Sequence, residues 1–281
     1  MLIISSIFFY LYDIKLGAEI RIFVVIFWAK SANKKESELT RVKTLQTTDL
    51  NQRSTSFDYT ILHLYFLMKL LDQIVAEKLL KVKAVKLQPN NPFTWASGWK
   101  SPIYCDNRKT LSYPEIRNFI KIELARLVCE HFGEATAIAG VATGAIAQGA
   151  MVAEELGLPF VYVRSKPKDH GLENLIEGDL RPGSKVLVIE DLISTGGSSL
   201  KAVEAIRNDG SEVLGMLAIF TYGFPIAEKQ FKEANVNCMT LSNYDAILNV
   251  ALATDYIDEA EIKTLQEWRH DPSKWQPLAH K

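Results

Sequence analysis

The 281 residues are enough for one large domain or two small ones with a buried core. Apolar residues make up 48% of the chain, charged residues 23%, and the formal net charge of −1 excludes a global attraction to nucleic acid or anionic lipid. Three scattered cysteines exclude a disulfide framework and a cysteine-based zinc site, and they favour buried thiols in a reducing cytoplasm.

Residues 1–67 differ in composition from the rest of the chain. Two apolar runs, 1–10 and 22–28, are too short for a membrane span of about 18 residues, and four charged residues divide them: Asp13, Lys15, Glu19 and Arg21. Residues 31–58 are polar and aperiodic, which predicts disorder. Because a regular amphipathic pattern opens at Met68, we expect 1–67 to be a non-native or disordered extension of a domain at 68–281. The alternative is a membrane-proximal anchor at 1–30, which the four charges disfavour.

From Met68 onward, apolar residues recur with the spacings of helices and strands. In the first part we expect helices at 69–80 and 114–131, with a short hairpin at 93–106 between them. Strands are then expected at 137–139, 160–163, 185–189, 212–220 and 237–241. Helices are expected up to 156 and at 198–207, 227–234, 244–254 and 258–269. Short apolar strands between helices indicate an α/β fold with a central parallel sheet flanked by helices. We expect its core at 134–242, a small cap (hood) at 68–133 and C-terminal helices at 243–275.

The most informative segment joins an apolar strand to a glycine-rich turn. Glu190 and Asp191 follow the strand, and Ser194-Thr195-Gly196-Gly197-Ser198 then opens a helix. Glycines let the backbone approach a phosphate closely, and the N–H groups at a helix start attract the anion. The two carboxylates suit ribose hydroxyls or a hydrated Mg²⁺. The segment therefore predicts a phosphorylated-sugar site, whereas an ordinary strand and turn is the alternative. The Walker and dinucleotide spacings do not occur.

This pattern resembles the signature of type I phosphoribosyltransferases, which bind 5-phospho-α-D-ribose 1-diphosphate (hereafter the sugar diphosphate). The resemblance implies the type I fold, with Glu190 and Asp191 on the ribose hydroxyls and the turn around the 5′-phosphate. It also implies that Mg²⁺ is held mainly by substrate and water, near Asp191, with no direct protein ligand. The contacts implied in this segment are Glu190, Asp191, Leu192, Ile193, Ser194, Thr195, Gly196, Gly197 and Ser198.

A long polar segment follows the strand at 160–163 and carries the cations Arg164, Lys166, Lys168 and His170. Beside a phosphate turn, such a loop suits a mobile lid over a diphosphate, although basic loops are often merely solvated. It resembles the catalytic loop of orotate phosphoribosyltransferases. The resemblance implies that Lys168, Asp169 and His170 are catalytic and that Arg164, Lys168 and His170 contact the sugar diphosphate. Ser165 stands where some members carry a second lysine.

Two further segments resemble the same family. In 93–106, a Ser-Gly turn precedes Ser-Pro and an aromatic, which implies that Tyr104 and Lys100 lie at the orotate, together with Ser194. Alternatively, Trp95, Trp99 and Tyr104 are core aromatics. Residues 140–146 match the turn that faces the diphosphate, with Gly144 where other members carry lysine. The resemblance covers about 69–275.

The resemblance implies transfer of ribose 5-phosphate to orotate, giving orotidine 5′-phosphate and diphosphate in pyrimidine biosynthesis. It further implies a cytoplasmic homodimer in which the loop of one subunit covers the partner's site, and a protein that binds neither nucleic acid nor membrane. A purine-base phosphoribosyltransferase is the runner-up, which the Lys-Asp-His-Gly run disfavours. A regulator that keeps the sugar pocket and binds RNA or DNA is disfavoured by the net charge.

Overall fold

The computed structural model describes residues 4–16, 20–31, 43–44, 70–95, 98–165 and 175–277. The chain divides into two compact units, Met1–Tyr59 and Thr60–Lys281. In the first unit, β1 (Ile4–Leu16) pairs antiparallel with β2 (Ile20–Ser31), and β3 (Lys43–Thr44) extends this pair on the β2 side. Within residues 31–58, which were expected to be disordered, the structure describes only the last residue of β2 and the two residues of β3.

The second unit is built on a six-stranded sheet with the order β10-β9-β8-β11-β12-β13. The strands are β8 (Ala137–Val141), β9 (Phe160–Val163), β10 (Ile176–Glu177), β11 (Lys185–Ile193), β12 (Glu212–Thr221) and β13 (Cys238–Asn243). All neighbours pair parallel except β10, which pairs antiparallel with β9. The predicted parallel sheet is confirmed. Edge strand β10 was not expected, because it lies in the polar segment after β9.

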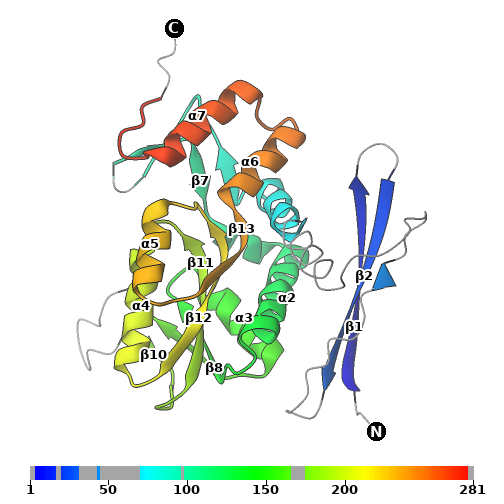
Figure 1. The fold of residues 1–281 in the computed structure, drawn as a ribbon, viewed down its shortest axis with the longest axis vertical. Coiled ribbons are helices and arrows are strands. Elements are labelled where there is room, and N and C mark those ends of the chain that lie inside the picture. Colours follow the sequence, from blue (N-terminus) through cyan, green and yellow to red (C-terminus); the bar gives the residue numbers. More distant parts are fainter. Residues whose placement is uncertain are drawn as a thin grey trace, which may run out of the picture. The chain divides into compact units, whose positions relative to one another are not determined.

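Helices cover both faces of this sheet. The helices are α2 (Pro114–His131), α3 (Ile146–Leu156), α4 (Gly197–Asn208) and α5 (Pro225–Glu233), and Figure 1 shows α2 and α3 on one side of the sheet and α4 and α5 on the other. Successive side chains of a strand point to opposite faces. Accordingly, Leu187 and Ile189 belong to the apolar cluster on the α2 side, whereas Val186 and Val188 belong to the cluster with α4. Both faces are buried along this stretch, so residues 186–189 are all apolar.

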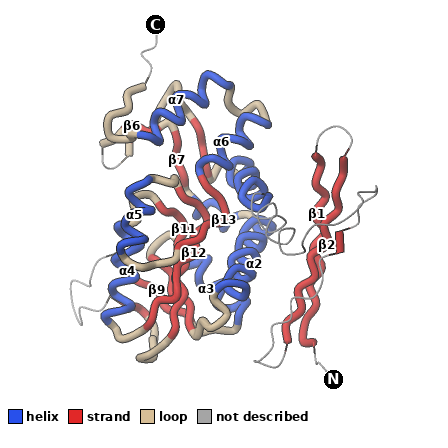
Figure 2. Tube along the Cα trace, in the orientation of Figure 1, coloured by secondary structure: helices blue, strands red, loops and turns tan. Residues whose placement is uncertain are grey.

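A hood stands at one end of the sheet and is made from both ends of the unit. Its first part contains β4 (Val85–Leu87) paired with β7 (Ile103–Cys105), and β5 (Phe93–Thr94) paired with β6 (Lys100–Ser101). The C-terminal helices α6 (Tyr244–Ala253) and α7 (Glu259–His270) complete it, and Figure 2 shows β6 and β7 beside α7. Fully buried Trp268 of α7 donates its indole N–H to the Lys100 carbonyl at 3.1 Å.

Two segments of the expected cap lie closer to the sheet. A helix over residues 70–81 is tied to β13, because the Ser242 hydroxyl donates to the Asp72 carbonyl at 2.8 Å. Helix α2 has the predicted bounds, and it packs against α3 and β12 rather than over the site. The small lobe is therefore assembled from the 85–105 hairpins and the C-terminal helices.

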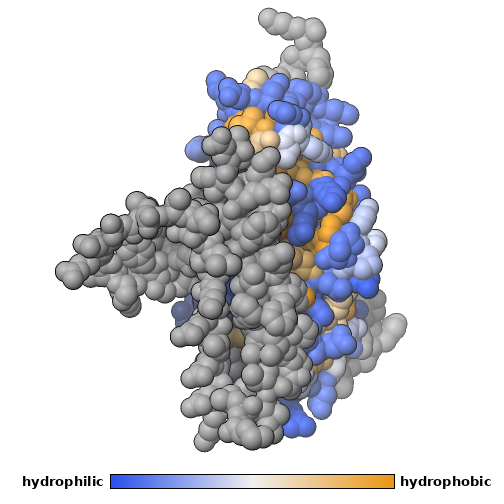
Figure 3. Space-filling model, turned by 90° about the vertical axis from the view of Figure 1, so that its right-hand side faces the viewer, coloured by the Kyte–Doolittle hydropathy of each residue, from blue (hydrophilic) through white to orange (hydrophobic). Residues whose placement is uncertain are grey.

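On the part of the surface that Figure 3 colours, hydrophilic residues predominate and hydrophobic residues form a band between them. The exposed large apolar side chains of this unit are Trp99, Tyr104, Tyr113, Ile226, Leu252 and Tyr256. Within the part of the chain that the structure describes, none of the helices combines the length and the hydropathy needed to cross a bilayer.

Candidate active site

The carboxyl ends of β8 and β11 form the crevice in which ligands of open parallel sheets bind. Strand β11 pairs with β8 only as far as Ile189, but with β12 as far as Ile193. Residues 190–193 therefore continue β11 paired with β12 along one edge, while the opposite edge is no longer paired with β8. The sequence predicted that β11 ends at Ile189, which is wrong because the ladder with β12 carries it four residues further.

Glu190 is the inner member of the acidic pair. Its side chain is 4% exposed, and both carboxylate oxygens accept hydrogen bonds, from the Ser199 hydroxyl at 2.8 Å and from the Asp191 N–H at 3.0 Å. Burial is the main cause that raises the pKa of Glu190 to about 8, and the neighbouring Asp191 charge raises it further, whereas the Ser199 hydroxyl lowers it. Glu190 is thus a buried acid whose ionisation the fold opposes.

Asp191 is half-buried and touches the turn after β8. Burial raises the pKa of the Asp191 carboxyl, while its hydrogen bond with Glu190 and the charge of Arg108 act in the opposite direction. A Cβ atom added at Gly144 would overlap the Asp191 carboxylate, so glycine at this position is required by the packing. The acidic pair and the turn expected to face the diphosphate are therefore in direct contact. Thr143, the neighbour of Gly144, is exposed.

The glycine-rich turn leads directly into α4, as predicted. Gly196 caps the helix in the left-handed region (φ 86°), and a side chain there would also collide with the Phe231 ring. Thr195, Gly197 and Ser198 are exposed, and Ser194 is half-buried. This exposure leaves the start of α4 accessible to an anion. Leu192 and Ile193 pack into the core, so any contact of these two with the sugar diphosphate would come from their backbone.

The residues that flank the segment after β9 are joined by a hydrogen bond and an ion pair. The Arg164 N–H donates to the Leu175 carbonyl at 2.8 Å, and the Arg164 guanidinium lies 3.4 Å from the Glu177 carboxylate. Arg164 would have to exchange this partner in order to contact a diphosphate. The three expected catalytic residues of the loop, Lys168, Asp169 and His170, lie outside the described residues, as does Lys166.

On the hood side, two of the three aromatics are available to a ligand. Tyr104 is 40% exposed with its ring centroid 5.5 Å from that of Phe93, and Trp99 is 37% exposed. Trp95 instead packs against Tyr222 and Trp268, so the core alternative is confirmed for Trp95 and wrong for the other two. The Lys100 ammonium is exposed and donates to the Thr94 hydroxyl at 2.8 Å.

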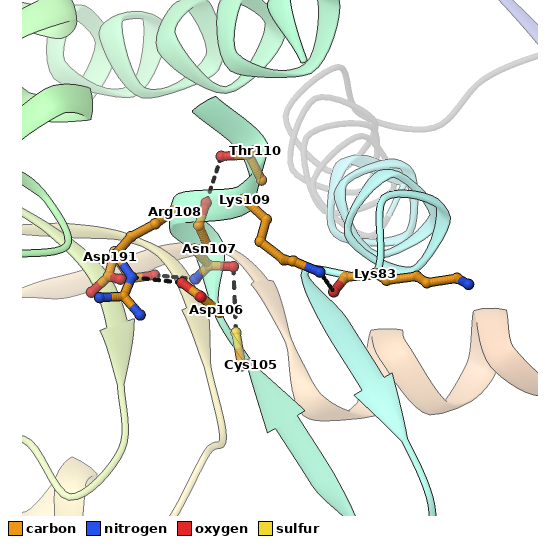
Figure 4. Close-up of polar contacts among 8 residues, drawn as sticks. All are labelled: Lys83, Cys105, Asp106, Asn107, Arg108, Lys109, Thr110 and Asp191. Atoms are coloured by element: carbon orange, nitrogen blue, oxygen red, sulfur yellow. Dashed lines mark hydrogen bonds and ion pairs between the residues drawn. The ribbon is translucent and has the colours of Figure 1, made fainter. Parts of the chain in front are cut away.

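Sequence reasoning missed the residues that hold the acidic pair in place. The Asn107 amide donates to the Asp191 backbone carbonyl at 2.5 Å, and Arg108 lies beside the Asp191 side chain, as Figure 4 shows. Both belong to the 3-10 helix η1 (Asn107–Ser112), which follows β7. No local sequence pattern predicts a contact between two residues that lie 84 positions apart. Within the described ranges, no three His, Cys, Asp or Glu side chains come together to hold a metal ion.

Comparison with known proteins identifies the family. The phosphoribosyl transferase domain family matches residues 113–254. An orotate phosphoribosyltransferase of Phocaeicola vulgatus is 72% identical over 209 residues, which make up 74% of this chain and 99% of the relative. The chain belongs to the orotate phosphoribosyltransferase family. The family and the type I fold predicted from the motifs are confirmed.

More distant members of the family agree. A Listeria innocua protein of the same name is 55% identical over 205 residues, 73% of this chain and 98% of the relative. The crystal structure of orotate phosphoribosyltransferase from Aeropyrum pernix superposes with a TM-score of 0.57 at 27% identity, over 65% of this chain and 99% of that one. The family match contains the Gly144 turn, the loop after β9 and the acidic pair, while the whole unit Met1–Tyr59 lies outside it.

Proposed function

We propose that the protein transfers ribose 5-phosphate from the sugar diphosphate to orotate, giving orotidine 5′-phosphate and diphosphate in pyrimidine biosynthesis. The observation that carries this proposal is the acidic pair at the end of β11, followed by an exposed glycine-rich helix start and faced by the Gly144 turn. Relatives up to 72% identical over nearly their whole length bear the name of this activity.

In the proposed reaction, the bond from sugar C1 to a diphosphate oxygen breaks as the bond to orotate N1 forms. The bonding pair leaves with the diphosphate, and the N1 proton passes to the diphosphate or to water. Negative charge accumulates on the departing diphosphate, so catalysis depends mainly on positioning and on electrostatic stabilisation. Arg164, Lys168 and His170 supply positive charge there, and Asp169 orients a loop cation. Asp191, backed by Glu190, holds the ribose hydroxyls, and residues 194–198 hold the 5′-phosphate.

The pyrimidine is assigned to the hood side of the crevice. The exposed Tyr104 ring offers an apolar face for stacking on a flat pyrimidine. The Lys100 ammonium attracts the carboxylate of orotate, and Ser194 contributes a hydroxyl donor from the turn. Because Trp268 binds the Lys100 backbone, helix α7 fixes the strand that carries this lysine.

The donor set fits Mg²⁺. The ion accepts hard oxygen ligands, keeps several waters and is commonly bound through one or two carboxylates together with substrate phosphates. Asp191 is half-buried and provides a carboxylate at the site, whereas both oxygens of the buried Glu190 already accept hydrogen bonds. Mg²⁺ would therefore be held mainly by substrate and water, near Asp191. When bound, Mg²⁺ would neutralise charge on the diphosphate.

We also propose that the protein acts as a cytoplasmic homodimer, with the loop of one subunit reaching the partner's site. The enzyme itself is assigned to residues 68–281. This assignment is supported by relatives that are matched over 98–99% of their length by 205–209 residues of this chain.

The test follows orotate through its ultraviolet absorbance, with the full chain, the sugar diphosphate and Mg²⁺. We expect orotate to be consumed only when both substrates are present, and Lys168→Ala to lower kcat about 10²- to 10³-fold. Lys229→Ala is the matched control, because this lysine is exposed on α5 and its ion-pair partner among the described residues is Glu233 at 3.9 Å. Turnover of a purine base without turnover of orotate would contradict the proposal.

A further inference from the structure

Asn107 lies at the junction between the hood and the sheet. It follows β7, which carries Tyr104, and begins η1, which leads to α2. Its side chain is 2% exposed, although asparagine is usually found at the surface. The side-chain amide donates to the Asp191 carbonyl at 2.5 Å, which joins the pyrimidine side of the crevice to the sugar side (Figure 4).

The orientation of this amide is set by its neighbours. The Cys105 thiol donates to the Asn107 side-chain oxygen at 3.4 Å, so the amide nitrogen is turned toward Asp191. The Thr110 hydroxyl donates to the Asn107 backbone carbonyl at 2.6 Å and holds the turn in which the residue stands. Asn107 is therefore held on both its side chain and its backbone.

The Asp191 carbonyl needs a donor because of its place in the sheet. The ladder between β11 and β8 stops at Ile189, two residues before Asp191. The described residue pairs between β11 and β12 include Glu190 and Leu192 but not Asp191. A buried carbonyl without a partner is costly, so a donor from outside the sheet stabilises this stretch. Asn107 takes the place that a neighbouring strand would fill.

We propose that Asn107 is a positioning residue that fixes Asp191 for binding of the sugar diphosphate, an inference that rests on the proposed function. The Asp191 carboxylate already fills the space above Gly144, so a shift of its backbone would move the carboxylate against that turn or away from the sugar. Arg108 is held differently, because its Nε–H donates to Asp106 at 2.7 Å and its side chain is 57% exposed.

The test compares two variants of the full chain. Asn107→Leu keeps the branching of the side chain without a donor. Lys109→Ala is the matched control, because it removes an exposed side chain from the same 3-10 helix and leaves the contacts of Asn107 in place. We expect Asn107→Leu to raise the KM and the equilibrium Kd of the sugar diphosphate with Mg²⁺ about tenfold, equivalent to about 1.4 kcal/mol. The KM of orotate at saturating sugar diphosphate should change less than about threefold, and Lys109→Ala should keep the wild-type Kd.

The outcomes separate the two claims. Equal Kd values for wild type and folded Asn107→Leu, or equal losses in Asn107→Leu and Lys109→Ala, would overturn the inference. If Asn107→Leu does not give a cooperative thermal transition, the same Kd is measured on Asn107→Asp, which keeps the size and replaces the donor with an acceptor. A wild-type Kd for that variant would again overturn it. Absence of orotate turnover by the wild-type chain would instead reject the proposed function.

Discussion

Replacing Glu190 by glutamine should make the protein more stable at high pH. Burial raises the pKa of Glu190 from an ordinary 4.5 to about 8, so the folded state keeps a proton that the unfolded chain has lost above pH 4.5. A group with a raised folded pKa contributes stability that is fully present below its unfolded pKa and is lost as pH rises through its folded pKa. The wild type should therefore lose stability between pH 4.5 and 8.

The size of the effect follows from the pKa difference. Each unit corresponds to 1.36 kcal/mol, so the rise from 4.5 to about 8 amounts to a cost of about 5 kcal/mol above pH 8. Glutamine has the same shape and does not ionise. Its oxygen can accept from the Asp191 N–H, and its NH2 group can donate to the Ser199 oxygen. Between pH 5.5 and 8.5, the stability of Glu190→Gln relative to wild type should increase by about 3 kcal/mol.

The assay is urea unfolding of both proteins at pH 5.5, 7.0 and 8.5, followed by tryptophan fluorescence. Taking the difference between variant and wild type cancels the titration of groups that the substitution leaves alone. A difference that stays constant over this range would refute the reasoning, since Glu190 would then carry the same charge in the folded and the unfolded chain. A difference that falls with pH would mean that the folded state favours the ionised form.

Three further predictions concern the site and the extent of the enzyme. Gly144→Ala should lower kcat/KM at least about 100-fold, because the added Cβ displaces the Asp191 carboxylate, and unchanged steady-state kinetics would contradict the contact. Trp268→Phe should lower the free energy of unfolding by about 1–2 kcal/mol, since the Lys100 carbonyl loses its indole donor, and an unchanged urea midpoint would count against this role. Residues 68–281 alone should keep kcat and both KM values within about twofold of the full chain, and a larger loss in the same assay would assign the first unit a part in activity.

The hydrophobic pattern was sufficient to predict most helices and strands of the second unit. Pro114 opens α2 and His131 ends it as expected, because a Pro at the first turn and apolar residues at helical spacing are local signals. Strand β9 was placed without error for the same reason, since its four apolar residues are bounded by Pro159 and Arg164. The turn at Gly196 was also predicted, because glycine is a local signal of a turn whose backbone takes a positive φ.

The tertiary structure decided what the local pattern does not contain. The extension of β11 to Ile193 depends on pairing with β12, and edge strand β10 on pairing with β9, so neither appears in the hydrophobic period of its own segment. The hood combines the 85–105 hairpins with α7, which are far apart in the sequence. By itself the sequence determined most elements of the second unit, the family and the glycine-rich turn, because these rest on neighbouring residues. The burial of Glu190, the contact of Asp191 with Gly144 and the bond from Asn107 required the folded chain, because each joins residues that only packing brings together.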